Sequence, residues 1–256
     1  MINADEIVVL DTGNIIKCKQ LTKQDFETLS DEMVESVRHC LDSLSRSFAN
    51  VDTKVDYTHE NHSSVVEAND RDQVRVCVKV FLTRFEENAV HDAVHKALTQ
   101  LDVNRIESLI VAFPPSGNHK IGLLQMQPVW RACEELIAQG SVCSAGVADL
   151  DLSQLSELYQ WAPSFKPTTN QLCLDTICNL PKEMTEFAAE NNIQLLSHGD
   201  DKELTSRVNV RRILHGFKGN VDDWICEFAT RYTVSFQCRG VLHSKGYIVK
   251  LRRESR

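Results

Sequence analysis

The sequence of 256 residues lacks the features that mark membrane and secreted proteins. No apolar stretch approaches the roughly 20 residues that a membrane-spanning helix needs. The first six residues, MINADE, carry no basic group and lead into no long apolar run, so we expect no secretory signal and a cytoplasmic location. Common enzyme motifs are missing too: none of the ten glycines belongs to a Gly-x-Gly-x-x-Gly, P-loop or Gly-x-Ser-x-Gly motif.

Paired cysteine motifs are also missing. The nine cysteines are an odd number, are widely dispersed and include no Cys-x-x-Cys pair. A zinc ribbon and a thioredoxin-like site are therefore not expected, and a secreted disulfide framework would be denser. We expect reduced cysteines that behave mostly as small apolar side chains. Cys178 is a redox candidate because it follows an expected strand and has Lys182 as a nearby cation, although an inert structural role is the alternative.

Acidic residues outnumber basic ones, but the charge is unevenly spread along the chain. The net charge of −8 argues against a general nucleic-acid binder. Residues 239–256, however, hold six basic side chains against Glu254 alone. This basic segment is either a solvated tail or a surface that docks on an acidic partner. In the second case the partner-binding candidates are Lys245, Lys250, Arg252 and Arg253.

From residue 75 onward the hydrophobic pattern alternates between two periods. Short β-branched or apolar runs are separated by stretches with apolar residues at helical spacing. The expected strands are residues 75–83, 108–113, 143–148, 170–174 and 193–197, and the expected helices are 88–101, 123–139, 152–161 and 181–190. This order is typical of βαβ units that form a parallel sheet.

The N-terminal part is less regular. Residues 7–10 and 15–19 suggest an opening hairpin, and residues 31–48 suggest an amphipathic helix. A doubly wound nucleotide-binding sheet usually has a glycine-rich first turn, which is missing. We therefore expect a single domain over residues 1–256, an α/β fold of the (β/α)8 TIM-barrel type in a full or a trimmed form, since such barrels typically need about 250 residues.

Three stretches carry a family resemblance. The run WRACEELIAQGSVCSAGVAD at 130–149 resembles a helix and strand of the aldo-keto reductases. The run KPTTNQL at 166–172 resembles the family's segment that ends in Asn-Gln, and residues 231–247 resemble its Arg-Tyr to Lys-Ser segment. The resemblance implies a reductase-like barrel.

The family's Asp-Tyr-Lys-His tetrad is incomplete in this sequence. The resemblance places Asp52, Tyr57 and Lys79 at three positions, through an Asp-x4-Tyr spacing and a lysine in an apolar strand. The same spacing also arises by chance in polar loops, so that alternative stays open. Phe113 occupies the position of the histidine. Carbonyl reduction needs a proton donor near the developing alkoxide, and phenylalanine supplies neither a hydrogen bond nor a charge.

The contacts that the family makes with its dinucleotide are also altered. The Ser-Asn pair that holds the nicotinamide amide corresponds to Ala148 and Asp149, and the stacking aromatic corresponds to His198. Gln171 is the one member of this set that is retained, and the Lys-Ser grip on the phosphate is reordered as Ser244-Lys245. The resemblance thus implies vestigial positions, no bound cofactor and no catalysis.

Longer runs point to one branch of this family. The runs QLSELYQWAPSFKPTTNQ, NIQLLSHGDDKEL and RGVLHSKGYIVKLRR are similar to those of the regulatory (modifier) subunits of glutamate–cysteine ligase. This resemblance implies a partner, the catalytic subunit of the ligase, whose use of glutamate improves and whose inhibition by glutathione weakens in the heterodimer. The alternative function is an NADPH-dependent reductase with an altered tetrad.

One further pattern gives weak support to a third function, that of a metal-dependent hydrolase. His91 and His95 stand four residues apart on an expected helix, as in a zinc protease, but with aspartate in place of glutamate between them. No third ligand follows at the spacing of such enzymes. A solvated helix edge is therefore the favoured interpretation, and no metal is expected.

Overall fold

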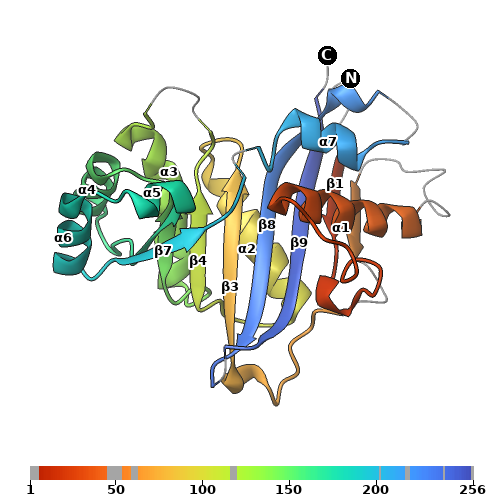
Figure 1. Cartoon of the computed structure of the whole chain (residues 1–256), viewed down its shortest axis with the longest axis horizontal. Coiled ribbons are helices and arrows are strands. Elements are labelled where there is room, and N and C mark those ends of the chain that lie inside the picture. Colours follow the sequence, from red (N-terminus) through yellow and green to blue (C-terminus); the bar gives the residue numbers. More distant parts are fainter. Residues whose placement is uncertain are drawn as a thin grey trace.

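The computed structural model describes residues 6–44, 54–58, 63–115, 120–201, 203–216, 220–238 and 240–254. These residues form one nine-stranded sheet with helices on both faces (Figure 1). The strands are β1 (Ile7–Asp11), β2 (Lys54–Thr58), β3 (Val74–Leu82), β4 (Ser108–Ala112), β5 (Ala145–Ala148), β6 (Thr169–Cys173), β7 (Gln194–His198), β8 (Trp224–Phe236) and β9 (Leu242–Arg253). The α-helices are α1 (Leu29–Leu44), α2 (Glu87–Leu101), α3 (Leu123–Ala138), α4 (Leu152–Trp161), α5 (Leu174–Cys178), α6 (Lys182–Glu190) and α7 (Arg207–Ile213), and short 3-10 turns cover Ile15–Lys17, Arg71–Gln73 and Val221–Asp223.

The sheet has a parallel half and a mostly antiparallel half. Its strand order is β2-β1-β9-β8-β3-β4-β5-β6-β7. Strands β3 to β7 are parallel to one another, as the alternating pattern of the sequence predicts. β8 and β9 form a long antiparallel hairpin, which pairs with β3 on one side and with β1 on the other.

The expected TIM-type α/β class is confirmed, in a trimmed form. In the described residues the two ends of the sheet, β2 and β7, each have one strand neighbour, so the strands do not close into a ring. The hairpin explains this opening. Two strands joined by a tight turn must run antiparallel, and β8 occupies the side of β3 to which another parallel strand would bind.

Two expectations for the chain ends are wrong. Residues 7–10 and 15–19 do not form a hairpin, because β1 pairs with β2 and β9 and is followed by a 3-10 turn that Asn14 caps. The described part of the basic segment, residues 240–254, is not a tail, because most of it is β9, a strand with neighbours on both sides. The apolar residues that alternate with its lysines and arginines, such as Val249 and Leu251, are buried and hold it in the sheet.

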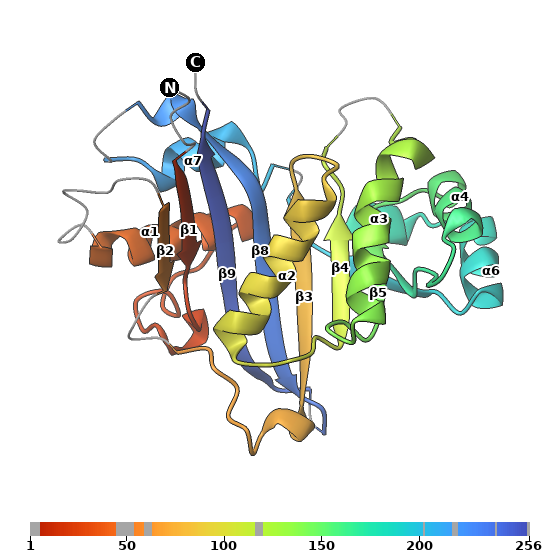
Figure 2. The ribbon, with the colours of Figure 1, turned by 180° about the vertical axis from the view of Figure 1, so that it is seen from behind.

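Two apolar layers fix the positions of the strands. On one face α2, α3, α4 and α6 pack on the parallel strands, and Figure 2 shows α2 and α3 in front of β3, β4 and β5. On the other face α1 and α7 pack on β1, β8 and β9. Val111 and Val147 have no exposed surface, whereas Leu195 is only partly buried because β7 is an edge strand. In the described residues no helix is long and apolar enough to cross a membrane.

A buried carboxyl group lies at the end of β1. Asp11 is 4% exposed, and its Oδ1 accepts hydrogen bonds from the Gly13 amide (2.9 Å) and the Tyr232 hydroxyl (3.4 Å). Tyr232 occupies the space beside Gly246, where an added Cβ would lie 2.2 Å from its hydroxyl oxygen. Burial raises the pKa of Asp11 to about 7. The hydrogen bonds from Gly13 and Tyr232 lower the pKa, but they do not offset the effect of burial.

Candidate functional site

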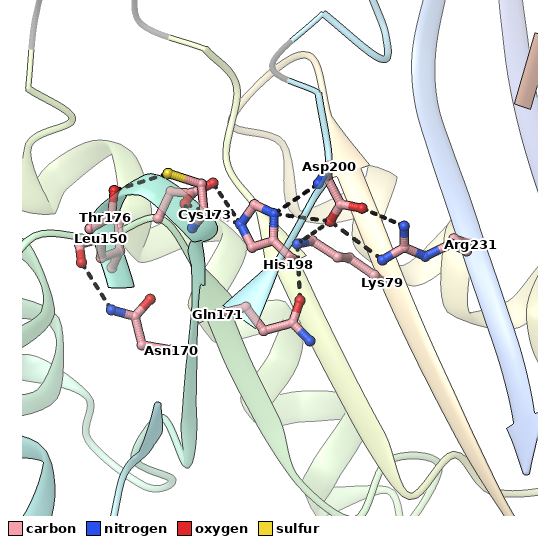
Figure 3. Close-up of polar contacts among 10 residues, drawn as sticks. Lys79, Leu150, Asn170, Gln171, Cys173, Thr176, His198, Asp200 and Arg231 are labelled. Carbon is pink, nitrogen blue, oxygen red and sulfur yellow. Dashed lines mark hydrogen bonds and ion pairs between the residues drawn. The ribbon is translucent and has the colours of Figure 1, made fainter. Parts of the chain in front are cut away.

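Polar side chains converge near the ends of the parallel strands β5, β6 and β7. They come from elements far apart in the sequence, and Figure 3 shows Lys79, Gln171, His198, Asp200 and Arg231 pointing toward one another. In a TIM-type fold the corresponding end of the barrel carries the functional groups. The members are Lys79 on β3, Asp149 after β5, Gln171 on β6, His198 and Asp200 at the end of β7, and Arg231 on β8.

Asp200 is the centre of this cluster. Its side chain is 3% exposed, and its Oδ2 lies 2.6 Å from the Lys79 Nζ. Its Oδ1 accepts a short hydrogen bond from the Arg231 guanidinium, which also lies over the ring of Phe81. A buried carboxylate needs such partners, because an isolated buried charge is costly. Lys79 and Arg231 are thereby committed to an internal ion pair.

His198 links Asp200 to Asp149. The Asp200 amide donates to His198 Nδ1 at 3.1 Å, and Nδ1 also lies 3.5 Å from Oδ2 of Asp200. Nε2 in turn lies within hydrogen-bonding distance of both oxygens of Asp149, at 3.0 and 3.1 Å. Asp149 has a left-handed backbone with φ of 57°, and its carboxylate also accepts from the Cys173 amide. The histidine is therefore held edge-on between two carboxylates.

The pKa values in the cluster follow from burial and from these pairs. Burial lowers the pKa of the Lys79 ammonium, and the attraction of Asp200 offsets this only in part. For Asp200, burial acts to raise the pKa, but the positive charges of Arg231 and Lys79 outweigh it and hold the pKa below its usual value. For Asp149, burial again acts to raise the pKa, and the hydrogen bond from His198 reverses the shift. The cluster is thus a balanced set of two cations and two anions.

These contacts do not fit a nicotinamide dinucleotide. Gln171, the retained member of the cofactor set, uses its Oε1 to accept from the Lys79 Nζ at 3.0 Å. Asp149 adds a negative charge and already accepts three hydrogen bonds. His198 is held by both of its ring nitrogens. The side chains that would bind a cofactor therefore already form hydrogen bonds with other groups of the protein.

Of the tetrad positions that the structure describes, Tyr57 and Lys79 are not brought together. Tyr57 lies on β2 and Lys79 on β3, four strands apart in the sheet order, which corresponds to about 19 Å measured along the sheet at about 4.8 Å per strand. Phe113 follows β4 and stacks on Phe85, with ring centroids 6.1 Å apart and an angle of 26° between the planes. It is a packing residue of the apolar layer. Asp52 lies outside the described residues.

The basic side chains of β9 all have acidic partners. Lys245 pairs with Glu32 at 2.5 Å and Lys250 with Asp92 at 2.7 Å. The remaining pairs are Arg252 with Glu227 (2.7 Å) and Arg253 with Glu6 (2.9 Å) and Asp223 (3.5 Å). These carboxylates neutralise much of the positive charge that the sequence suggested. That the four residues bind a partner stays a prediction.

The other candidate residues lie apart from the cluster. Cys178 is exposed at the end of α5, and Lys182, the cation expected to assist it, pairs instead with Glu186 at 3.0 Å. His91 lies 3.1 Å from Glu135 of α3. Among the described residues, no group of three or more His, Cys, Asp or Glu side chains could hold a metal ion.

Asp200 and Arg231 are the members that the sequence did not nominate. Asp200 lies in a run that resembles the ligase subunits and Arg231 in a stretch that resembles the aldo-keto reductases, but no local spacing connects residues 31 positions apart. The available signal was an acidic residue directly after the last parallel strand, where the side chains of a TIM-type site gather.

Comparisons with known proteins identify the family of this chain. A model of the Aldo/keto reductase family matches residues 48–199, more than half of the chain. The glutamate–cysteine ligase regulatory subunits of Mus musculus and Homo sapiens are each 31% identical over 256 residues, which covers 95% of this chain and 92% of theirs. The crystal structure of an aldo/keto reductase from Klebsiella pneumoniae is 16% identical with a TM-score of 0.41, covering 76% of this chain and 59% of that one. The chain therefore belongs to the aldo/keto reductase family and, within it, to the glutamate–cysteine ligase regulatory subunits.

Proposed function

We propose that this chain is a non-catalytic regulatory subunit that binds the catalytic subunit of a glutamate–cysteine ligase in the cytoplasm, as a heterodimer. The ion pair between Lys79 and Asp200 carries the proposal. A reductase needs a proton donor beside this lysine. Here the Lys79 ammonium contacts the buried carboxylate of Asp200, 2.6 Å away, and the side chain of Gln171, whereas Tyr57 lies four strands away in the sheet. The names of the relatives support the choice of partner.

The regulatory action follows from differential binding. A subunit that bound all states of its partner equally would shift nothing. We therefore propose that this chain prefers the ligase state with high affinity for glutamate and low affinity for glutathione. A coupling of about 1–3 kcal/mol corresponds to roughly 5–150-fold in a binding constant.

Reconstitution with a purified catalytic subunit tests this function. The expected result is a lower apparent Michaelis constant for glutamate and weaker inhibition by glutathione when this chain is added. An active aldo/keto reductase at the same concentration is the matched control, because it shares the fold and lacks the proposed role. Unchanged kinetic constants at saturating concentrations of this chain would contradict the proposal.

The alternative reductase has one observation in its favour, the retention of a buried lysine on β3. It predicts that NADPH binds at micromolar concentration and that a carbonyl is reduced. Quenching of NADPH fluorescence separates the two functions, because the pairs of Gln171 and Asp149 leave no ready contacts for the nicotinamide.

A further inference from the structure

The edge strand β7 differs from the edge strand at the other end of the sheet. Natural sheets protect their edges with charges, prolines or bulges, because an open edge pairs readily with another chain. β2 has the sequence KVDYT, and its Asp56 pairs with Lys96 of α2 at 2.5 Å. β7 has the sequence QLLSH, with no acidic or basic residue other than a histidine that is engaged inside the site. Its pairing with β6 runs over five residues without a bulge.

The outer side of β7 offers backbone groups for another strand. The Gln194 amide donates to Thr168 of the β6 side at 2.9 Å, so residues 194, 196 and 198 direct their amides and carbonyls toward β6. The alternate residues, Leu195 and Ser197, direct theirs away from the sheet. No described strand pairs with β7 on that side.

Exposed aliphatic side chains accompany this edge. Leu196 is 43% exposed and shares a face of the sheet with Gln171, its partner on β6. Leu174, at the start of α5, is 55% exposed, and α5 lies against β7. An added strand with an aliphatic side chain opposite Leu196 would cover apolar surface as well as backbone groups.

The charges around β7 indicate the kind of segment that fits. α5 and α6 both lie against β7 and carry four exposed carboxylates against one lysine. That lysine, Lys182, is already paired with Glu186. The acidic residues are Asp175, Glu183, Glu186 and Glu190. A second copy of this acidic chain would be repelled, whereas a segment flanked by lysine or arginine would be attracted.

We propose that β7 is a docking strand, on which an extended aliphatic segment of the partner subunit, flanked by basic residues, adds as a tenth strand. The identity of the partner rests on the proposed function, whereas the mode of binding rests on the edge itself. Strand addition of this kind gains affinity from main-chain hydrogen bonds and specificity from alternate side chains.

Substitutions at Ser197 test the main-chain contacts. Its amide points away from β6, so Ser197→Pro removes an outward donor and leaves the ladder between β6 and β7 intact. Ser197→Ala keeps the amide and is the matched control. We expect Ser197→Pro to weaken binding of the full chain to the catalytic subunit at least tenfold in Kd, and Ser197→Ala to change it less than twofold. Circular dichroism of both variants checks that they are folded.

Two further measurements do not depend on the proline variant. In the wild-type chain, hydrogen exchange at the amides of Leu195 and Ser197 is expected to slow at least tenfold when the catalytic subunit binds. Reversal of Glu183 and Glu190 to lysine is expected to raise Kd and to reduce its dependence on salt. A complex in which these two amides exchange at the free rate would overturn the docking strand and leave the proposed function standing.

The remaining outcomes are also decisive. If the chain alone dimerises and Ser197→Pro abolishes the dimer, a second copy occupies β7 and the proposed partner segment is wrong. If the wild-type chain does not bind the catalytic subunit in any assay, the proposed function fails, and with it the occupant assigned to β7.

Discussion

Arg231 on β8 and Asp200 after β7 form an ion pair between two strands that share no backbone hydrogen bond. In a closed barrel consecutive strands are neighbours in the wall. Here β8 pairs with β3 and β9, so a side-chain contact spans the opening where a backbone ladder would run. Lys79 of β3 binds the other oxygen of the same carboxylate, which ties the edge strand to the middle of the sheet.

Replacement of this carboxylate should therefore destabilise the fold. Asp200→Asn removes the carboxylate that pairs with both Lys79 and Arg231, whose side chains are 5% and 16% exposed, and leaves Asp149 as the remaining anion of the cluster. Loss of one partner from a buried pair typically costs about 3–5 kcal/mol of unfolding free energy. Denaturant unfolding measures the loss. Asp175→Asn, which removes the same charge from an exposed site, is expected to change stability by less than about 0.5 kcal/mol. Equal effects of the two variants would contradict this role of Asp200.

Asp11 should make stability fall as the pH rises. Its pKa is about 7 in the folded protein, whereas the ordinary value of 3.8 applies to the unfolded chain. Between pH 3.8 and 7, therefore, only the unfolded state loses the proton. The folded state then binds more protons, and the free energy of unfolding decreases by about 1.4 kcal/mol per pH unit. The contribution is fully present below pH 4 and lost by the time the pH passes 7.

Asp11→Asn should remove this dependence. As the pH rises from about 4 to 7, the unfolding free energy of Asp11→Asn is expected to increase relative to that of the wild type. Above pH 7 the difference between the two proteins should stay constant. The two proteins share all other titrating groups, so the difference isolates this carboxyl. A difference that does not change with pH would show that Asp11 is ionised in the fold.

The parallel half of the fold could be predicted from the sequence because its signals are local. Val76, Val78 and Val80 alternate on one strand, and Val90, Ala93 and Val94 recur at helical spacing on the next helix. The position of the β8–β9 hairpin in the sheet could not be predicted from the sequence, because its pairing with β3 joins residues about 150 positions apart. No local sequence pattern specifies which strand pairs with the open side of β3.

The site was predicted only in part for the same reason. Lys79, Asp149, Gln171 and His198 were nominated by their positions in short motifs, and the fold does bring them together. Tyr57 matched a motif by spacing alone, and the strand order places it far from Lys79. Asp200 and Arg231 acquire their role only through the contact between them, which depends on the tertiary fold.

The core of the parallel half offers a test of the packing. Val111 on β4 has no exposed surface and lies in the apolar layer under α2 and α3. Val111→Ala is expected to lower the free energy of unfolding by about 1–3 kcal/mol, through lost contacts and a small cavity. Val208→Ala, at a position on α7 that is 55% exposed, is the matched control and should have little effect. Similar losses at the two positions would contradict the burial of β4.

Restoration of the missing histidine should not restore a reductase. Phe113→His supplies the fourth tetrad residue at the end of β4, but three obstacles remain. Tyr57 lies four strands from Lys79, the Lys79 ammonium is bound by Asp200 and Gln171, and Asp149 places a carboxylate where the nicotinamide amide would bind. The substitution also removes the stacking of Phe113 on Phe85.

We therefore expect no NADPH consumption above background from the wild type or from Phe113→His with a panel of aldehydes and ketones. Phe113→Leu, which is apolar and cannot transfer a proton, is the matched control for the lost aromatic contact. Thermal unfolding of all three proteins separates inactivity from misfolding. Turnover by Phe113→His but not by Phe113→Leu would mean that a proton donor and a cofactor can still assemble around Lys79, and that one residue at the end of β4 is what separates this chain from a reductase.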